Sequence, residues 1–156
     1  MDLFRAIEKN EMREFNYIIT NDKTKVTERN ESGMTPLMVV SSKNQVEMAK
    51  LLIENGADVN GRDDYLGETP LMWAAFNNSK EVAKLLIENN ANINARDNDG
   101  MTPLMWASQS NAYEVAKLLI QYNANTTDKN NKGDDAMMLA VRKNSIEVMN
   151  LIQAKR

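Results

Sequence analysis

The tripeptide Thr-Pro-Leu recurs three times in this chain of 156 residues, at almost constant intervals. The copies begin at Thr35, Thr69 and Thr102, so the intervals are 34 and 33 residues. Single glycines keep the same period and stand at Gly33, Gly67, Gly100 and Gly133. A unit of this length that repeats in phase predicts a solenoid, in which each unit buries its apolar face against its neighbours. The longer interval holds one additional residue, which falls within residues 63–66.

Each unit carries the sequence signals of two helices followed by a loop. A threonine hydroxyl can cap a helix and the proline after it suits the first helical position, which predicts a first helix from Thr69 to Asn77 in one unit. In the helix that follows, Val82, Leu85 and Leu86 form one apolar stripe. Glycine and asparagine tolerate the left-handed conformation, so we expect the second helices to end at Gly56, Asn90 and Asn123. The next stretch, such as residues 91–100, predicts an extended loop or hairpin finger.

The pattern Gly-x-Thr-Pro-Leu-x-x-Ala, then Glu-Val-Ala-Lys-Leu-Leu-Ile, then Asn-Ala-Asn-Ile-Asn resembles the ankyrin repeat over nearly the whole chain. The resemblance implies an all-α solenoid of stacked helix-turn-helix repeats with hairpin or loop fingers. We expect one domain over residues 1–156, with an N-terminal capping repeat at 1–31, full repeats at 32–64, 65–97 and 98–130, and a C-terminal capping repeat at 131–156. The last repeat is degenerate, because Asp135-Ala136-Met137 replaces Thr-Pro-Leu.

One departure from the family recurs, because methionine stands where the family usually has a histidine that braces the start of the first helix. These methionines are Met38, Met72, Met105 and Met138. We expect them to replace the polar bracing with apolar packing in the core.

The ends of the array carry polar residues at a position where the inner units are apolar. Thr20 and Gln153 correspond to Ile53, Ile87 and Ile120. Terminal repeats of a solenoid need a polar outer face, so we expect a complete, capped array of about five units. The alternative is a boundary chosen within a longer chain.

Composition argues against catalytic and metal chemistry. The chain has no histidine and no cysteine, which removes the commonest general base, thiolate nucleophiles and the usual zinc ligands. Residues 97–100 resemble part of a calcium-binding loop, but Ala95 and Trp106 occupy two of its ligand positions. Acidic pairs such as Asp97 and Asp99 lie in expected turns, where Asp commonly binds local backbone. We expect no enzyme activity, no metal and no cofactor; an enzyme that uses a carboxylate pair is the alternative.

The charge pattern disfavours nucleic acid and membranes as partners. A net charge of -3 and an isoelectric point of about 5.1 predict a field that repels phosphate groups. Neither a membrane-spanning segment nor a signal peptide is recognisable, so we expect a cytoplasmic protein. A secreted or periplasmic chain whose signal peptide has been removed is the alternative. Residues 125–156 are mildly basic, with Lys129, Lys132, Arg142 and Lys143, and can face an acidic partner or simply water.

By resemblance, partner contacts fall on the finger turns and the ends of the first helices. Mapped onto this chain, the candidates are Arg62, Tyr65, Leu66, Glu68, Trp73, Phe76, Asn77, Arg96, Asn98, Asp99, Met101, Trp106, Gln109 and Ser110. Among them Tyr65, Leu66 and Phe76 are large apolar groups expected to be exposed, which favours a partner that covers them. Alternatively, Tyr65 and Leu66 fold back as a plug on the adjacent finger. For Trp73 and Trp106 we expect packing between repeats with a rim exposed to the binding face.

The sequence therefore predicts a monomeric, non-enzymatic module that binds a protein partner through its finger loops and concave helix face. The identity of that partner is not encoded in any readable motif. One alternative is a module that inhibits or regulates an enzyme or toxin by occluding it, and another is a structural spacer without a partner.

Overall fold

Pairs of helices stack in a row from one end of the molecule to the other. The computed structural model describes residues 2–155, in which all regular structure is helical. The helices are α1 (Leu3–Glu8), α2 (Met12–Asn21), the 3-10 helix η1 (Lys23–Thr27), α3 (Pro36–Ser42), α4 (Val46–Glu54), α5 (Pro70–Phe76), α6 (Lys80–Glu88), α7 (Pro103–Ser110), α8 (Tyr113–Gln121), α9 (Ala136–Arg142) and α10 (Ile146–Lys155).

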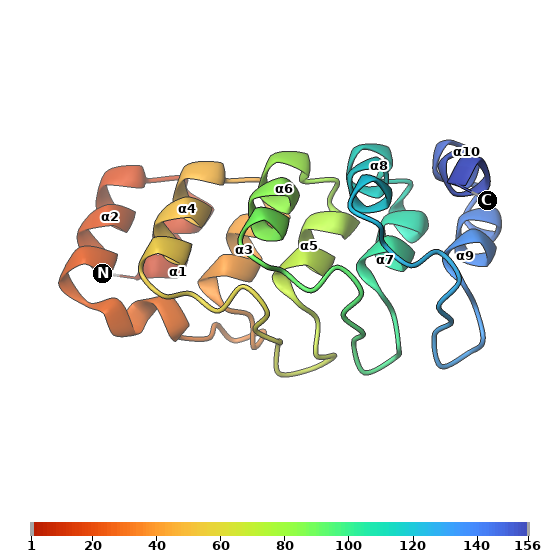
Figure 1. The fold of residues 1–156 in the computed structure, drawn as a ribbon. Coiled ribbons are helices and arrows are strands. Elements are labelled where there is room, and N and C mark those ends of the chain that lie inside the picture. The colour runs from red at the N-terminus through yellow and green to blue at the C-terminus, as the bar shows by residue number, and fades with distance from the viewer. Residues whose placement is uncertain (1, 156) are drawn as a thin grey trace.

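The odd-numbered helices form one layer and the even-numbered helices form the other (Figure 1). Loops that join one pair to the next project from the same side of the row, and we call them fingers. One continuous hydrophobic core runs between the layers, from Leu3 in α1 to Ile152 in α10. This arrangement confirms the expected all-α solenoid of stacked helix pairs with loop fingers.

The first helix of each full unit begins where the Thr-Pro-Leu motif predicts. The Thr69 hydroxyl accepts a hydrogen bond from the Met72 backbone N–H at 3.4 Å, and Pro70 takes the first helical position. The Met72 sulfur in turn accepts the Thr69 backbone N–H at 3.4 Å. The same reciprocal pair forms at the start of α3 and of α7. These methionines are therefore buried in the core, as expected, while their sulfur atoms also retain a polar bracing role.

The last unit departs from this pattern. Met138 is 45% exposed, so the expectation that it packs in the core is wrong. The cap of α9 is the Asp135 carboxylate, which accepts the Met138 backbone N–H at 2.8 Å. No further helix pair follows α9 and α10 among the described residues to cover this side chain.

Asparagines in the left-handed conformation shape the turns. Asn90 and Asn123 adopt it after α6 and α8, and Gly56 does so after α4, as predicted. A second series, between the two helices of each pair, was not predicted: Asn10, Asn44, Asn78, Asn111 and Asn144. Asn44 and Asn78 bond the second helix of the next repeat, because the Asn44 side chain accepts the Val82 N–H and the Asn78 side chain accepts the Val115 N–H, each at 3.1 Å. They supply the caps that the α6 and α8 N-termini otherwise lack.

Arginines link successive fingers. The guanidinium of Arg29 donates to the carbonyl oxygen of Arg62 at 2.8 Å, and that of Arg62 donates to the carbonyl oxygen of Arg96 at 2.6 Å. Arg96 donates to the carbonyl oxygen of Lys129 in the same way. Arg29 and Arg62 each donate a second bond within their own finger, to the carbonyl oxygens of Gly33 and Gly67. The ladder holds the fingers in register.

Removing two rungs of this ladder should destabilise the fold measurably. The double variant Arg62→Ala, Arg96→Ala is expected to lower the free energy of unfolding by about 2 kcal/mol, since each exposed charge-assisted bond contributes about 1 kcal/mol. Lys129 provides the matched control, because it holds the same place in the last finger and donates to no later finger in the described chain. Urea denaturation that shows equal effects for Lys129→Ala and the double variant would refute the ladder.

Candidate functional site

The fingers and the exposed side of α5, α7 and α9 form one surface, which we call the finger surface. It comprises the exposed parts of residues 62–68, 96–101 and 129–134 together with those of the three helices. This is the surface on which the sequence analysis placed the candidate contacts. The geometry of its side chains decides what it can bind.

Three large apolar side chains are exposed on the second finger and α5, in addition to Met138 and Val141 on α9. Tyr65 is 68% exposed, Leu66 40% and Phe76 46%, as the sequence predicted. The additional residue of the second finger lies where expected, because the Asp63 carboxylate accepts the N–H groups of Tyr65, Leu66 and Gly67 at 2.8–3.0 Å. This Asp-centred turn fixes the loop and directs two apolar side chains outward.

Tyr65 also touches the preceding finger. Its hydroxyl donates to the carbonyl oxygen of Glu31 at 3.3 Å. The ring nevertheless stays mostly in contact with solvent, and the Leu66 carbonyl accepts the Asn98 N–H at 2.8 Å. The Asn98 side-chain amide also donates to the Tyr65 carbonyl oxygen at 3.4 Å. These bonds tie the segment to its neighbours and leave the apolar faces of Tyr65 and Leu66 uncovered.

The two tryptophans differ in their hydrogen bonding. Trp106 packs against the core while its indole N–H donates to Asp97 Oδ2 at 3.1 Å. Phe76 stands edge-on to the Trp106 ring, with 5.7 Å between ring centroids. The Trp73 indole nitrogen is buried and has no hydrogen-bond partner among residues 2–155. The two rings are partly buried, and the interpretation that they pack between repeats with an exposed rim agrees with this placement.

Several other candidates have roles inside the molecule. Arg62 and Arg96 belong to the finger ladder, and the Asn77 side chain donates to the Trp73 carbonyl oxygen at 2.8 Å. Met101 is buried. Exposed or partly exposed positions that remain available to a partner are Glu68, Asn98, Asp99, Gln109 and Ser110. That any of these residues contacts a partner stays a prediction.

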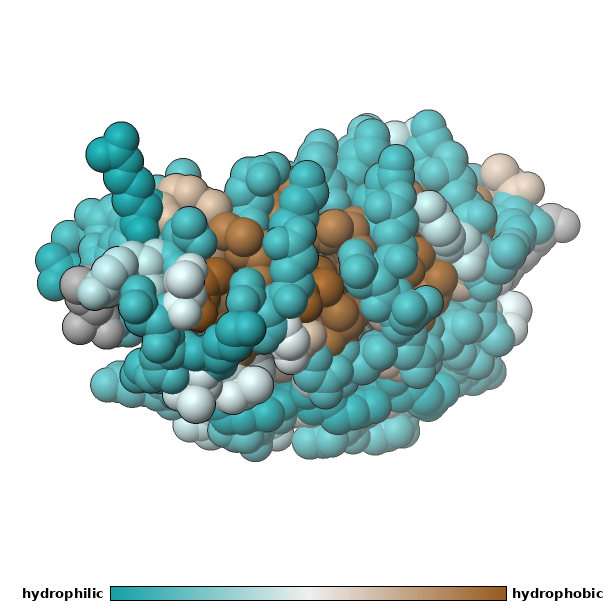
Figure 2. Space-filling model, turned by 60° about the vertical axis from the view of Figure 1, so that its left-hand side comes forward, coloured by the Kyte–Doolittle hydropathy of each residue, from teal (hydrophilic) through white to brown (hydrophobic). Residues whose placement is uncertain are grey.

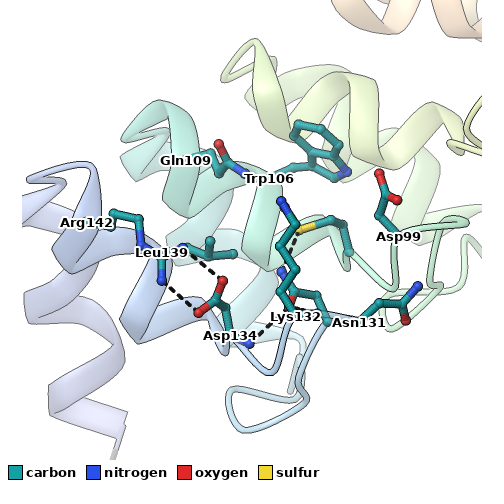
Figure 3. Close-up of a pocket in the computed structure, with 10 residues that line it drawn as sticks. Asp99, Trp106, Gln109, Asn131, Lys132, Asp134, Leu139 and Arg142 are labelled. Carbon is teal, nitrogen blue, oxygen red and sulfur yellow. Dashed lines mark hydrogen bonds and ion pairs between the residues drawn. The ribbon is translucent and has the colours of Figure 1, made fainter.

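A cavity of about 220 Å³ opens on the finger surface between α7, α9 and the last two fingers (Figure 3). Four candidates from the sequence line it, namely Asp99, Met101, Trp106 and Gln109. The other side is formed by Asn130, Asn131, Lys132, Asp134, Leu139 and Arg142. The sequence analysis did not place this second group at the centre of the site, because it treated residues 125–156 as a basic end.

The wall of the cavity contributed by α9 and the finger before it contains a well-formed ion pair. The Arg142 guanidinium donates two hydrogen bonds to the Asp134 carboxylate, each at 2.8 Å. These bonds hold the pKa of Asp134 below its ordinary value. The charges of the pair compensate each other, and Lys132 on the rim forms no ion pair with a described residue.

Four carboxylates of the second and third fingers interact electrostatically, and we call them the acidic cluster: Asp63, Glu68, Asp97 and Asp99. Burial raises the pKa of Glu68 to about 8, and a hydrogen bond with Asp63 and the negative charges of the other three carboxylates act in the same direction. Asp97 also has a raised pKa, because its burial outweighs the hydrogen bonds it accepts. Those bonds come from the N–H groups of Asp99, Met101 and Trp106, so Asp97 has a structural role.

The raised pKa of Glu68 predicts a pH-dependent cost to stability. Between pH 4.5 and about 8 the Glu68 carboxyl is deprotonated in the unfolded chain but protonated in the folded chain. The free energy of unfolding therefore falls as pH rises through this range. Replacing Glu68 by Gln removes the effect. After allowance for solvent screening of a half-buried group, Glu68→Gln should gain about 1–2 kcal/mol relative to the wild type between pH 5 and pH 8.5. A stability difference in urea that is the same at both pH values would contradict this.

Exposed apolar side chains also occur outside the finger surface. They include Tyr17 on α2, Tyr122 after α8 and Ile146 on α10. Figure 2 shows a row of hydrophobic residues along one face, broken by hydrophilic ridges. Because Tyr17 and Tyr122 are exposed aromatic residues outside the finger surface, they serve as controls for Tyr65 and Phe76.

The structure offers little for other kinds of site. Within residues 2–155 no group of three or more acidic side chains is arranged to hold a metal ion. Every helix in the same range is too short or too polar to cross a lipid bilayer.

The sequence was also compared with models of known families. A family model described as ankyrin repeats, in three copies, matches residues 3–97 and 92–155.

Proposed function

Since the chain belongs to the ankyrin repeat family, whose members are generally non-enzymatic modules of protein–protein interaction, we propose that it binds a protein partner through its finger surface. The centre of the contact is formed by Tyr65, Leu66 and Phe76. The protein acts as a monomer in this proposal, because the array already packs its own helix pairs into one core.

The observation that carries this proposal is the exposure of three large apolar side chains on one surface of a well-packed molecule. Exposed apolar groups that cluster are typical of protein interaction sites, and aromatic residues dominate binding energies at such sites. The fingers that carry them are tied to one another by hydrogen bonds, so little conformational entropy is lost on binding. A complex of standard size buries about 1,200–2,000 Å² in total.

The proposal is tested by affinity capture from cells that make the protein. The wild type is compared with the triple variant Tyr65→Ser, Leu66→Ser, Phe76→Ser, after circular dichroism has shown that the variant keeps its helix content. We expect one or more proteins to be retained by the wild type and lost from the triple variant. The double variant Tyr17→Ser, Tyr122→Ser removes two exposed aromatic residues elsewhere and should retain the same proteins.

Two results would contradict the proposal. If the triple variant retains everything that the wild type retains, the binding surface lies elsewhere. If neither protein retains a partner, a spacer role becomes the better explanation. Where a captured partner is an enzyme, its activity is measured with and without this protein, which shows whether binding also inhibits that enzyme.

A further inference from the structure

The finger surface around Trp106 combines aromatic faces with negative charge. Phe76 stands edge-on to the indole, and Asp97 holds the indole N–H. Asp99 lines the same cavity, and Figure 3 shows its carboxylate on the side of the cavity where the indole lies. Glu68 is close enough to Asp97 and Asp99 for their charges to raise its pKa. Aromatic rings and carboxylates thus face one small region.

No cation of the described chain neutralises the acidic cluster. None of the ion pairs within residues 2–155 involves any of its four carboxylates. The guanidinium groups of Arg62 and Arg96 donate to carbonyl oxygens of the neighbouring fingers instead. Two carboxylates of the cluster remain open to a partner, since Glu68 is partly exposed and Asp99 is exposed.

We propose that the partner presents a lysine or arginine side chain to this region. Its charge is held by Asp99 and by Glu68, which gives up its proton when the cation binds, and its aliphatic stem packs against Phe76 and Trp106. This inference rests on the proposed function and names the chemistry of the partner segment. A cation gains from carboxylate hydrogen bonds and from the faces of aromatic rings, and its stem covers apolar surface. Tyr65 and Leu66, exposed on the finger that precedes Glu68, are available for further apolar contact with the same partner.

The opposite choice, an acidic segment, has weaker support. Only Lys132 offers an unpaired ammonium group on the rim of the cavity, because Arg142 is paired with Asp134. A partner carboxylate placed near Lys132 would meet Asp99 on the other side of the same cavity. The balance of charge therefore favours a cationic segment, and Lys132 supplies a control of opposite sign.

The test uses a phage-displayed library of random twelve-residue peptides selected on the full chain. Peptides that need Tyr65, Leu66 and Phe76 are identified by their loss on the triple serine variant, and are then synthesised. Their affinities are measured by calorimetry for the wild type, for the double variant Glu68→Gln, Asp99→Asn and for the single variant Lys132→Gln. The two neutral amide substitutions keep the size and shape of the carboxylates.

We expect these peptides to share a lysine or arginine whose replacement by alanine weakens binding about 10-fold or more. Glu68→Gln, Asp99→Asn should weaken binding by a similar factor, and Lys132→Gln should leave it unchanged or strengthen it. Peptides that need the apolar patch but neither carboxylate, or acidic peptides that are lost on Lys132→Gln, would overturn this inference and leave the proposed function standing. A selection without any peptide dependent on the patch would contradict both.

Discussion

Affinity for the captured partner is expected to fall about 100-fold or more when Tyr65, Leu66 and Phe76 are all replaced by serine. Each side chain is large, apolar and 40–68% exposed, and the three lie on neighbouring elements of one surface. Truncating a buried aromatic or aliphatic anchor at an interface commonly costs about 1–2 kcal/mol or more. Calorimetry with the purified partner measures the change directly.

The single variants separate binding from the intramolecular contact of Tyr65. Phe76→Ser should have the largest single effect, because it also removes the edge contact that supports Trp106. Tyr65→Phe removes the hydroxyl bonded to Glu31 but keeps the ring, so it should leave partner affinity nearly unchanged. Equal losses for Tyr65→Phe and Tyr65→Ser would mean that the finger-to-finger bond, not apolar contact, is what matters.

A large loss of stability is expected for Gly100→Ala. Gly100 has a φ of +75°, and a Cβ there would lie 2.7 Å from the Asn131 side chain, 3.0 Å from the Asn131 backbone nitrogen and 3.0 Å from the Arg96 guanidinium. The methyl group would therefore push apart two fingers that the arginine ladder joins. We expect the free energy of unfolding to fall by about 3 kcal/mol, of which strain at positive φ contributes about 1–2 kcal/mol.

Gly133 provides the matched comparison for this effect. It has the same place in the last finger and a φ of +82°, but a Cβ there would meet no atom within 4 Å. Gly133→Ala should therefore cost about 1–2 kcal/mol, from backbone strain alone. If urea denaturation shows the same loss for both alanine variants, close approach of the fingers is not a source of stability.

Sequence periodicity predicted much of this architecture for identifiable physical reasons. The Thr-Pro pair marks the start of each first helix because both residues satisfy the local chemistry of a helix N-terminus. The exposure of Tyr65, Leu66 and Phe76 followed from their places in a finger and at a helix end. Helix starts and exposed loop positions depend on local sequence, and the repeat strengthened the prediction because the Thr-Pro signal occurs three times.

Features that depend on contacts between units were not predicted. The arginines at 62 and 96 look like solvent or partner contacts in the sequence, because their carbonyl acceptors lie in the next finger. The short helix η1 precedes the finger of the first unit and buries Val26, without a sequence signal that marks its start. Met138 shares the phase of the buried methionines but lies in α9, and no helix pair within residues 2–155 follows α9 and α10 to cover it.

The binding surface is tested most directly by photochemical cross-linking from a single position. The photoreactive amino acid p-benzoylphenylalanine replaces Phe76 in one variant and Tyr17 in another, and each variant is irradiated in cells that make the protein. The finger-surface account predicts a protein cross-linked from position 76 and not from position 17. The account is contradicted if no protein is cross-linked from position 76, or if the same proteins are cross-linked equally from both positions.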